Sequence, residues 1–370
     1  MKKWMQHIAL LLLAWVALFP EFIANDDPIL LRSEKVWICP ACKEWLSDYE
    51  YQTQPDDEAV WKPIIPFDER TLEPGGFTLR PPLSKGVKSI HILGTDSQSR
   101  DVLSGLIYGL RYAVLIAILS ILFAAFVGVV TGLLAAYFGN THLRLHPLQL
   151  LILLIFLPTI GYISVYFSAW LGLLLGLCTL MALKFTSGQQ KGTMKMAIPL
   201  DQWITKLTDT WDSLPALFVL LACIALGARW DILSLSLLIA AFKWPGFYRI
   251  SRAELQKYRN SEWIQTLKSL DVPDKQIIMK ELAPLLITPL SVHAAFSMAS
   301  AVSIEATLSF LGLGLSAEVV SWGSLLMEAR QHFDAWWLVL FPGICLAVFL
   351  LGLNTLAKRF QNRQFNRATP

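Results

Sequence analysis

The sequence predicts an all-α polytopic membrane protein with about eight transmembrane helices. Of its 370 residues, 55% are hydrophobic and only 16% are charged, whereas about 25% of the residues in an ordinary soluble domain are charged. The apolar residues also fall in long runs, and a helix needs roughly 20 such residues to cross a bilayer. These observations argue against a soluble enzyme and against a disordered chain.

The expected spans are residues 8–23, 107–138, 148–168, 169–185, 214–228, 232–247, 285–308 and 336–353. Only a short stretch from Gly227 to Asp231 separates the fifth from the sixth, so their identity as two separate spans stays open. Residues 1–24 form the first helix. Because Lys2 and Lys3 precede its apolar run, a cleaved signal peptide is the alternative, although no clean A-x-A site follows.

The distribution of Lys and Arg predicts that both termini are cytoplasmic. With an even number of spans, most basic residues of the short loops lie inside, and the short outer loops hold only Arg229 and Arg330. The net charge of +3, from 31 Lys and Arg against 28 Asp and Glu, gives no reason to expect a nucleic-acid partner.

Residues 25–105 form an extracytoplasmic, loop-rich segment that is rich in proline and acidic residues. It contains Cys39 and Cys42 in a C-x-x-C spacing, which is compatible with a redox pair, half of a zinc site or a structural disulfide. Since neither a second C-x-x-C nor an α/β domain accompanies the pair, we expect a local disulfide in an oxidising compartment and no metal site.

The membrane domain then covers residues 106–360, and residues 361–370 form a cytoplasmic tail. An inner polar stretch begins near Lys243, and residues 249–284 form its loop. Trp263, Leu267 and Leu270 follow a helical spacing, so we expect a short helix over 262–270. Asp271 and Pro273 break this helix, and a new helix begins at Asp274. Such a helix pair can transmit force from a cytosolic partner, or it can simply lie at the membrane surface without a partner.

This loop resembles the cytoplasmic loop of permeases in the dipeptide/oligopeptide ABC importer family, which follows E-Y-V-E-A-A-x-A-L-G-A-S and then I-I-x-x-H-I-L-P. The match runs from Glu262 to Pro284. Gln265, Thr266 and Leu267 replace the glutamate and alanines of the motif, and Asp271 replaces its glycine. An aspartate can adopt left-handed backbone angles, although less readily than glycine.

Two further segments resemble the same family. Residues 91–116 resemble the outer signature G-T-D-x-x-G-R-D-V-L-S-R-L-I-Y-G-x-R, with Ser99 in place of a glycine and Gly105 in place of an arginine. Residues 305–330 resemble E-x-x-L-S-F-L-G-L-G…S-W-G. The resemblance is to the second permease subunit, which commonly has six spans. The excess is a hairpin at 146–185, which has no charged residue between Pro147 and Leu183 and is expected at the periphery of the bundle.

The resemblance implies a type I importer bundle in the bacterial inner membrane that works by alternating access. The implied partners are a sister permease in a heterodimer, two cytosolic ATPase subunits and an extracytoplasmic substrate-binding protein. ATP and Mg would be bound by the ATPase subunits, so this chain would hold no cofactor. Peptides are the default cargo, although relatives carry nickel and other solutes. The sequence contains none of G-x-x-x-x-G-K-[ST], H-E-x-x-H and G-x-S-x-G, which argues against an enzyme.

Two groups of candidate site residues follow from the resemblance. The ATPase-coupling loop would use Glu262, Trp263, Gln265, Thr266, Leu267, Leu270, Asp271, Pro273, Ile277 and Pro284. The outer gate or binding-protein docking surface would use Gly94, Thr95, Asp96, Arg100, Asp101, Arg111, Glu305, Ser321, Trp322 and Gly323.

Two other functions stay open. The altered loop and the extra hairpin are compatible with a diverged, non-transporting scaffold or regulatory subunit. An ion-driven secondary transporter would need charged residues in the middle of its spans, and we find none there in the sequence.

Overall fold

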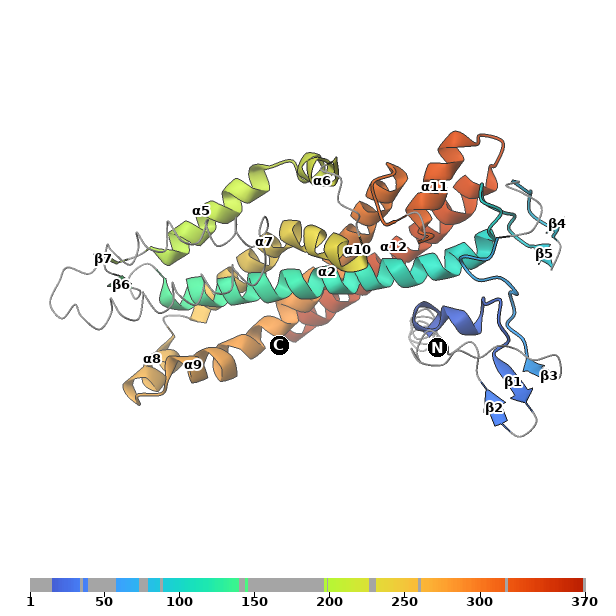
Figure 1. Ribbon diagram of the computed structural model, residues 1–370. Helices are drawn as coiled ribbons and strands as arrows, with labels where there is room; N and C mark the ends of the chain where they lie inside the picture. The colour runs from blue at the N-terminus through green and yellow to red at the C-terminus, as the bar shows by residue number, and fades with distance from the viewer. Residues whose placement is uncertain are drawn as a thin grey trace, which may run out of the picture. The chain divides into compact units, whose positions relative to one another are not determined.

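The computed structural model describes residues 15–33, 36–38, 58–72, 79–86, 89–139, 144–145, 196–197, 199–225, 231–258, 261–316 and 319–368. These residues belong to two compact units. Figure 1 labels their helices and strands. Unit 1 comprises Met1–Gly128, Leu214–Tyr248 and Ile287–Pro370, and unit 2 comprises Val129–Ser213 and Arg249–Leu286. Cys39, Cys42, the start of the first expected span and the expected hairpin at 146–185 lie outside the described residues.

Most described residues are helical, as the composition predicts. The helices are α2 (Val102–Phe138), α5 (Leu200–Ser213), α6 (Ala216–Ala225), α7 (Ile232–Tyr258), α8 (Glu262–Ser269), α9 (Asp274–Gln276), α10 (Ala283–Phe310), α11 (Trp322–Gln331) and α12 (Trp337–Ala368). A 3-10 turn, η1 (Pro20–Phe22), precedes them, and a π-helical segment, η3 (Ile277–Leu282), joins α9 to α10.

Three helical segments of the described chain are long and apolar enough to cross a membrane: Val102–Tyr137, Asp274–Phe310 and Trp337–Asn362. They confirm a membrane protein, while the total of eight spans remains a prediction. The expected fifth span contains α6, which has ten residues.

Helix α7 runs without a break from Ile232 to Tyr258, past residue 247, where the sixth expected span ends. Lys243, assigned from the sequence to the inner polar stretch, therefore lies in the middle of a helix. The change from apolar to charged residues ended the expected span at this point, but a helix that leaves a membrane does not have to end there. Pro245 lies within α7 without ending it.

Short strands accompany the helices of this mainly α-helical chain. In the N-terminal segment, β1 (Leu30–Ser33) pairs antiparallel with both β2 (Val36–Ile38) and β3 (Glu58–Trp61), and β4 (Ser84–Lys85) pairs with β5 (Ile90–His91). In unit 2, β6 (Arg144–Leu145) pairs with β7 (Met196–Ala197). Each strand has two to four residues, so most of the described N-terminal segment is loop, as expected.

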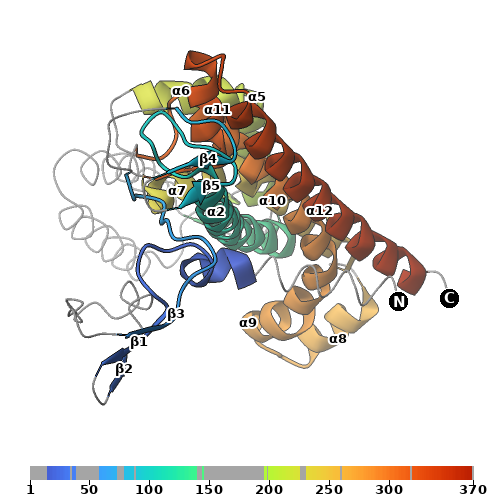
Figure 2. The ribbon, with the colours of Figure 1, turned by 90° about the vertical axis from the view of Figure 1, so that its right-hand side faces the viewer.

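The core of unit 1 forms where α2, α10, α11 and α12 meet (Figure 2). The indole of Trp322 packs edge-on against Phe349, with ring centroids 5.5 Å apart, and its Nε1 donates to the carbonyl of Leu106 at 2.9 Å. Further along α2, a Cβ at Gly128 would lie 2.5 Å from the Cβ of Phe247. The missing side chain therefore lets α2 and α7 pack closely at this point.

Candidate functional site

The predicted helix–turn–helix is present in unit 2. Helix α8 begins after Ser261 and ends at Leu270, and α9 begins at Asp274 directly after Pro273. Asp271 has a φ of +53°, which is the left-handed conformation that the sequence comparison with a glycine position suggested. The amide of Val272 donates back to the carbonyl of Leu267 at 3.1 Å and closes the turn.

Helix α8 is anchored by Ile264, whose side chain is 1% exposed. It lines a small cavity together with Ala136, Leu255 and Leu282. By contrast, Trp263 is 38% and Leu270 is 70% exposed, and Leu267 is half-buried. The sequence spacing thus identified the outward-facing apolar residues but missed the inward-facing one.

Tyr137, near the end of α2, holds both sides of the turn. Its hydroxyl donates to Oδ1 of Asp274, the first residue of α9. The ammonium of Lys268 on α8 lies 4.8 Å from the centroid of its ring, in cation–π geometry. The Tyr137 side chain is buried. This positioning residue lies far from the loop in sequence, and no local signal marked it.

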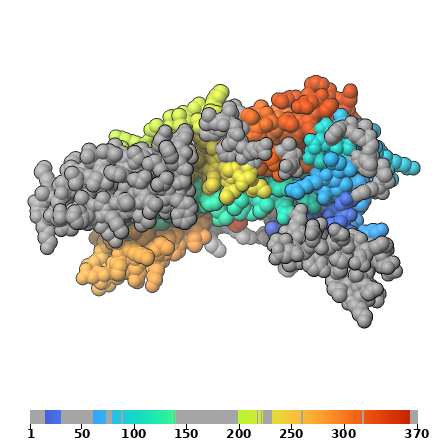
Figure 3. All heavy atoms as spheres, viewed as in Figure 1, coloured from blue at the N-terminus to red at the C-terminus, as the bar shows by residue number. Residues whose placement is uncertain are grey.

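The other candidates of this loop divide by exposure. Ile277 is fully buried, whereas Glu262, Gln265, Thr266, Pro273 and Pro284 are exposed. The exposed Met279 adds an apolar side chain on η3. The exposed large apolar side chains of α8, its turn and η3 are Trp263, Leu270 and Met279, and these three residues are here called the apolar patch. The atoms of α8 and α9 appear in orange at the surface in Figure 3.

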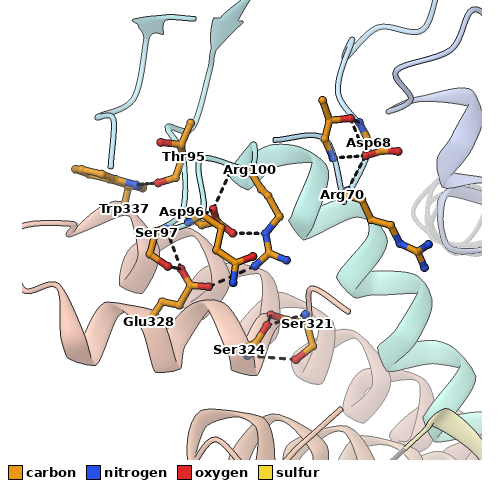
Figure 4. A network of polar contacts seen from close by, with 12 residues as sticks. Asp68, Arg70, Thr95, Asp96, Ser97, Arg100, Ser321, Ser324, Glu328 and Trp337 are labelled. Carbon is orange, nitrogen blue, oxygen red and sulfur yellow. Dashed lines mark hydrogen bonds and ion pairs between the residues drawn. The ribbon is translucent and has the colours of Figure 1, made fainter. Parts of the chain in front are cut away.

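The second candidate site is a cluster of polar residues in unit 1 that joins the 94–101 loop to α11 (Figure 4). Arg100 binds Asp96, with Nε 2.6 Å from Oδ2, and its Nη2 lies 3.5 Å from Oε1 of Glu328. The other carboxylate oxygen of Glu328 accepts from the amide and the hydroxyl of Ser97, at 3.0 and 2.8 Å. Burial, together with the charge of Asp96, raises the pKa of Glu328 above its ordinary value.

The remaining outer candidates brace this cluster. A Cβ at Gly94 would lie 2.6 Å from the carbonyl oxygen of Arg80, and the residue has a φ of +84°, so glycine is required here. The carbonyl of Thr95 accepts from Nε1 of Trp337 at 3.0 Å. Asp101 binds Nδ1 of His91 at 2.9 Å and accepts from the amide of Ser104 in the first turn of α2.

Ser321 caps α11 through a reciprocal pair with Ser324. The adjacent Gly323 is packed so tightly that a Cβ would lie 2.5 Å from the carbonyl oxygen of Ala306. The two remaining charged candidates, Glu305 and Arg111, bind residues outside this cluster. Glu305 is buried in α10 and accepts from the hydroxyl of Ser309 at 2.8 Å, and Arg111 forms an ion pair with Glu21 of η1.

The structure thus brings Asp96 and Arg100 close to α11. Their partner on α11 is Glu328, a residue that the sequence did not single out. Beside this cluster lies a cavity of about 190 Å³, whose polar lining includes Arg100, Ser309, Ser321, Ser324 and Glu328. Among the described residues, no group of His, Cys, Asp and Glu is arranged to hold a metal ion.

Comparison with known proteins gives consistent results. Residues 185–367 match the family described as "Binding-protein-dependent transport system inner membrane component". The chain is 24% identical to the inner membrane ABC transporter permease protein YejE of Escherichia coli, over 92% of this chain and 86% of the relative. It is 26% identical to the di/tripeptide transport system permease protein DppC of Pseudomonas aeruginosa, over 80% and 78%. It is also 24% identical to the peptidoglycan transport system permease protein YejE of Agrobacterium fabrum, over 92% and 83%.

Proposed function

Because the chain belongs to the family of binding-protein-dependent transport system inner membrane components, we propose that it is the permease subunit of an ABC importer whose cargo is a peptide. The peptide assignment draws on relatives whose names specify di- and tripeptides, dipeptides and peptidoglycan. The proposed complex contains a sister permease, two cytosolic ATPase subunits and an extracytoplasmic binding protein, with both termini of this chain in the cytoplasm.

The observation that carries this proposal is the α8–turn–α9 arrangement. In the proposed mechanism, α8 docks in a groove of an ATPase subunit through the apolar patch of Trp263, Leu270 and Met279. A coupling element must present a face to its partner and still move as one body with its own chain. Ile264 and Tyr137 supply that attachment from the inner side of α8, and the exposed Trp263 and Leu270 supply the face.

We assign the second cluster to the outer gate or to the docking surface for the binding protein. Its residues are mostly buried, so their role in this proposal is to hold the 94–101 loop against α11 rather than to touch a partner directly. Opening of the gate would separate Arg100 from Glu328, and the adjacent cavity gives these side chains room to move.

Replacing Trp263 by alanine tests the proposal. Truncating an aromatic anchor at an interface often costs about 2 kcal/mol or more, which would weaken the complex roughly thirtyfold. We expect Trp263→Ala to release the ATPase subunits during co-purification, or to abolish the stimulation of ATP hydrolysis by cargo in reconstituted vesicles. Trp203→Ala is the matched control, because Trp203 is also exposed in unit 2 but lies on α5.

The result separates the importer from the non-transporting scaffold. If the wild-type protein binds no ATPase, or if Trp263→Ala and Trp203→Ala behave alike, α8 is not a coupling helix and the scaffold function replaces the importer.

A further inference from the structure

Lys243 forms a polar contact between α7 and α10 of unit 1. Its Nζ donates to the hydroxyl of Ser300 on α10 at 2.6 Å. Between Asp231 and Arg249, Lys243 is the sole charged residue of the sequence. Ser300 lies ten residues before the end of α10 at Phe310, or about 15 Å along the helix. That distance is about half the thickness of a bilayer core, so a bilayer whose surface lies at Phe310 would have Ser300 near its middle.

The lysine side chain points away from the charged C-terminal part of its own helix. Gly246 packs directly on His293, since a Cβ at Gly246 would lie 2.6 Å from the ring Nε2. Ser300 is seven residues, or about 10 Å, further along α10 than His293. Lys243 therefore extends along α10 in the direction of Phe310, rather than toward the end of α7 that carries Arg249, where a lysine near a membrane surface would normally place its charge.

Within the described part of the chain, the neighbourhood of Lys243 supplies hydrogen-bonding groups and no acidic partner. The ring of His293 packs against Gly246, three residues after Lys243 on α7, and its Nε2 lies 3.3 Å from the hydroxyl of Ser297. Among the residues that the structure describes, no acidic side chain forms an ion pair with Lys243. Lys243, His293 and Ser300 are all half-buried, so part of this site is open on the single chain.

We propose that Lys243, Ser300 and His293 form a site on the translocation path that binds the carboxylate of a peptide. A charged side chain at this depth is costly in lipid, and such residues face a bundle interior or a water-filled cavity. An ammonium with donors to spare, next to a hydroxyl, is suited to a carboxylate. This inference rests on the proposed function, because it names the group of the cargo that the permease itself contacts.

Thiol labelling in the assembled importer tests the charge preference of the site without measuring transport. With Ser300→Cys in a chain whose native cysteines are replaced, an anionic methanethiosulfonate should react at least about tenfold faster than a cationic one of similar size, because Lys243 attracts the anion. Adding Lys243→Met should bring the two rates close together, and Lys243→Arg should keep the preference. Equal rates for the two reagents with Lys243 present would overturn the inference.

Uptake of two peptides tests the ligand. With one binding protein throughout, Lys243→Met should raise the KM for a dipeptide with a free carboxylate about tenfold and leave that of its C-terminal amide unchanged. Lys257→Met, an exposed lysine on the same helix, is the matched control and should behave like the wild type. If Lys243→Met does not insert into the membrane, Lys243→Gln and Ser300→Ala provide the same comparison.

The two proposals fail in different ways. If the wild-type complex takes up no peptide, the proposed function is wrong, and the labelling rates still determine whether the site prefers anions. If the complex takes up both peptides and Lys243→Met slows them equally, the cargo assignment stands and Lys243 has no role in recognising the carboxylate.

Discussion

Replacing Tyr137 by phenylalanine removes the hydroxyl that binds Asp274 and keeps the ring beneath Lys268. A hydrogen bond to a charged group contributes about 1.5–3 kcal/mol. Because Asp274 is exposed and water can replace the lost donor, we expect the lower end of that range. The cation–π contact with Lys268, worth about 0.5–1 kcal/mol at an exposed site, is retained. The net loss of about 1.5 kcal/mol corresponds to a roughly tenfold larger population in which the turn has opened.

Amide hydrogen exchange in the reconstituted protein measures this opening directly. Peptides covering 262–282 should exchange about tenfold faster in Tyr137→Phe than in the wild type. The matched control is Tyr112→Phe, which removes a hydroxyl on the same helix that donates to Glu69 at 2.7 Å. Exchange in 262–282 should be unaffected by this control. An unchanged rate in Tyr137→Phe, or an equal change in both variants, would refute the role assigned to Tyr137.

Three further substitutions test individual positions. Asp271→Gly should stabilise the turn by up to about 1 kcal/mol, because it removes the strain of a left-handed aspartate, and should preserve uptake, whereas Asp271→Val should lower both the Tm and uptake. Gly128→Ala should lower the Tm by the equivalent of about 1–3 kcal/mol through overpacking against α7, whereas Gly352→Ala, with no atom within 4 Å of the added methyl group, should not. Because the pKa of Glu328 is raised in the folded protein, the folded state holds this proton more tightly than the unfolded state. The resulting contribution to stability is fully present below the ordinary pKa of a glutamate, and it is lost as the pH rises through the raised pKa. Glu328→Gln should therefore reduce the fall in Tm between about pH 4 and pH 7, and an unchanged fall would contradict this assignment.

The helix–turn–helix could be predicted from sequence because its signals are local. The spacing of Trp263, Leu267 and Leu270 identifies α8, and Pro273 marks the start of the next helix. The two places where a family glycine is replaced, Ser99 and Asp271, both have a positive φ, at +64° and +53°. The chain therefore retains the left-handed backbone with residues that adopt it at some cost in free energy. A residue that replaces a family glycine can therefore indicate where the backbone is left-handed, even when the changed motif makes the function harder to predict.

The contacts that hold these elements could not be predicted, because their partners lie far apart in the chain. Ser97 and Glu328 are 231 residues apart, and Tyr137 and Asp274 are 137 residues apart. No periodicity connects such residues, and one sequence contains no record of which distant side chains meet. Ile264 was missed for a related reason. The three apolar residues around it suggested one face of α8, while the cavity that receives Ile264 is formed by α2, α7 and η3.

The partner of a charged residue helps to tell a structural role from a functional one, and Lys243 differs in this respect from several other charged residues. The charged candidates Arg100 and Arg111 each have an acidic partner in the structure, as does Arg252, which binds Asp201. These pairs neutralise their own charge and fix one helix or loop against another. Within the described residues Lys243 on α7 bonds instead to the hydroxyl of Ser300 on α10. A protein that only needed to join α7 to α10 could do so with apolar side chains, as Gly128 and Phe247 join α2 to α7. Keeping a cation there is favourable when a ligand brings the opposite charge, and a peptide carboxylate is a ligand of that kind.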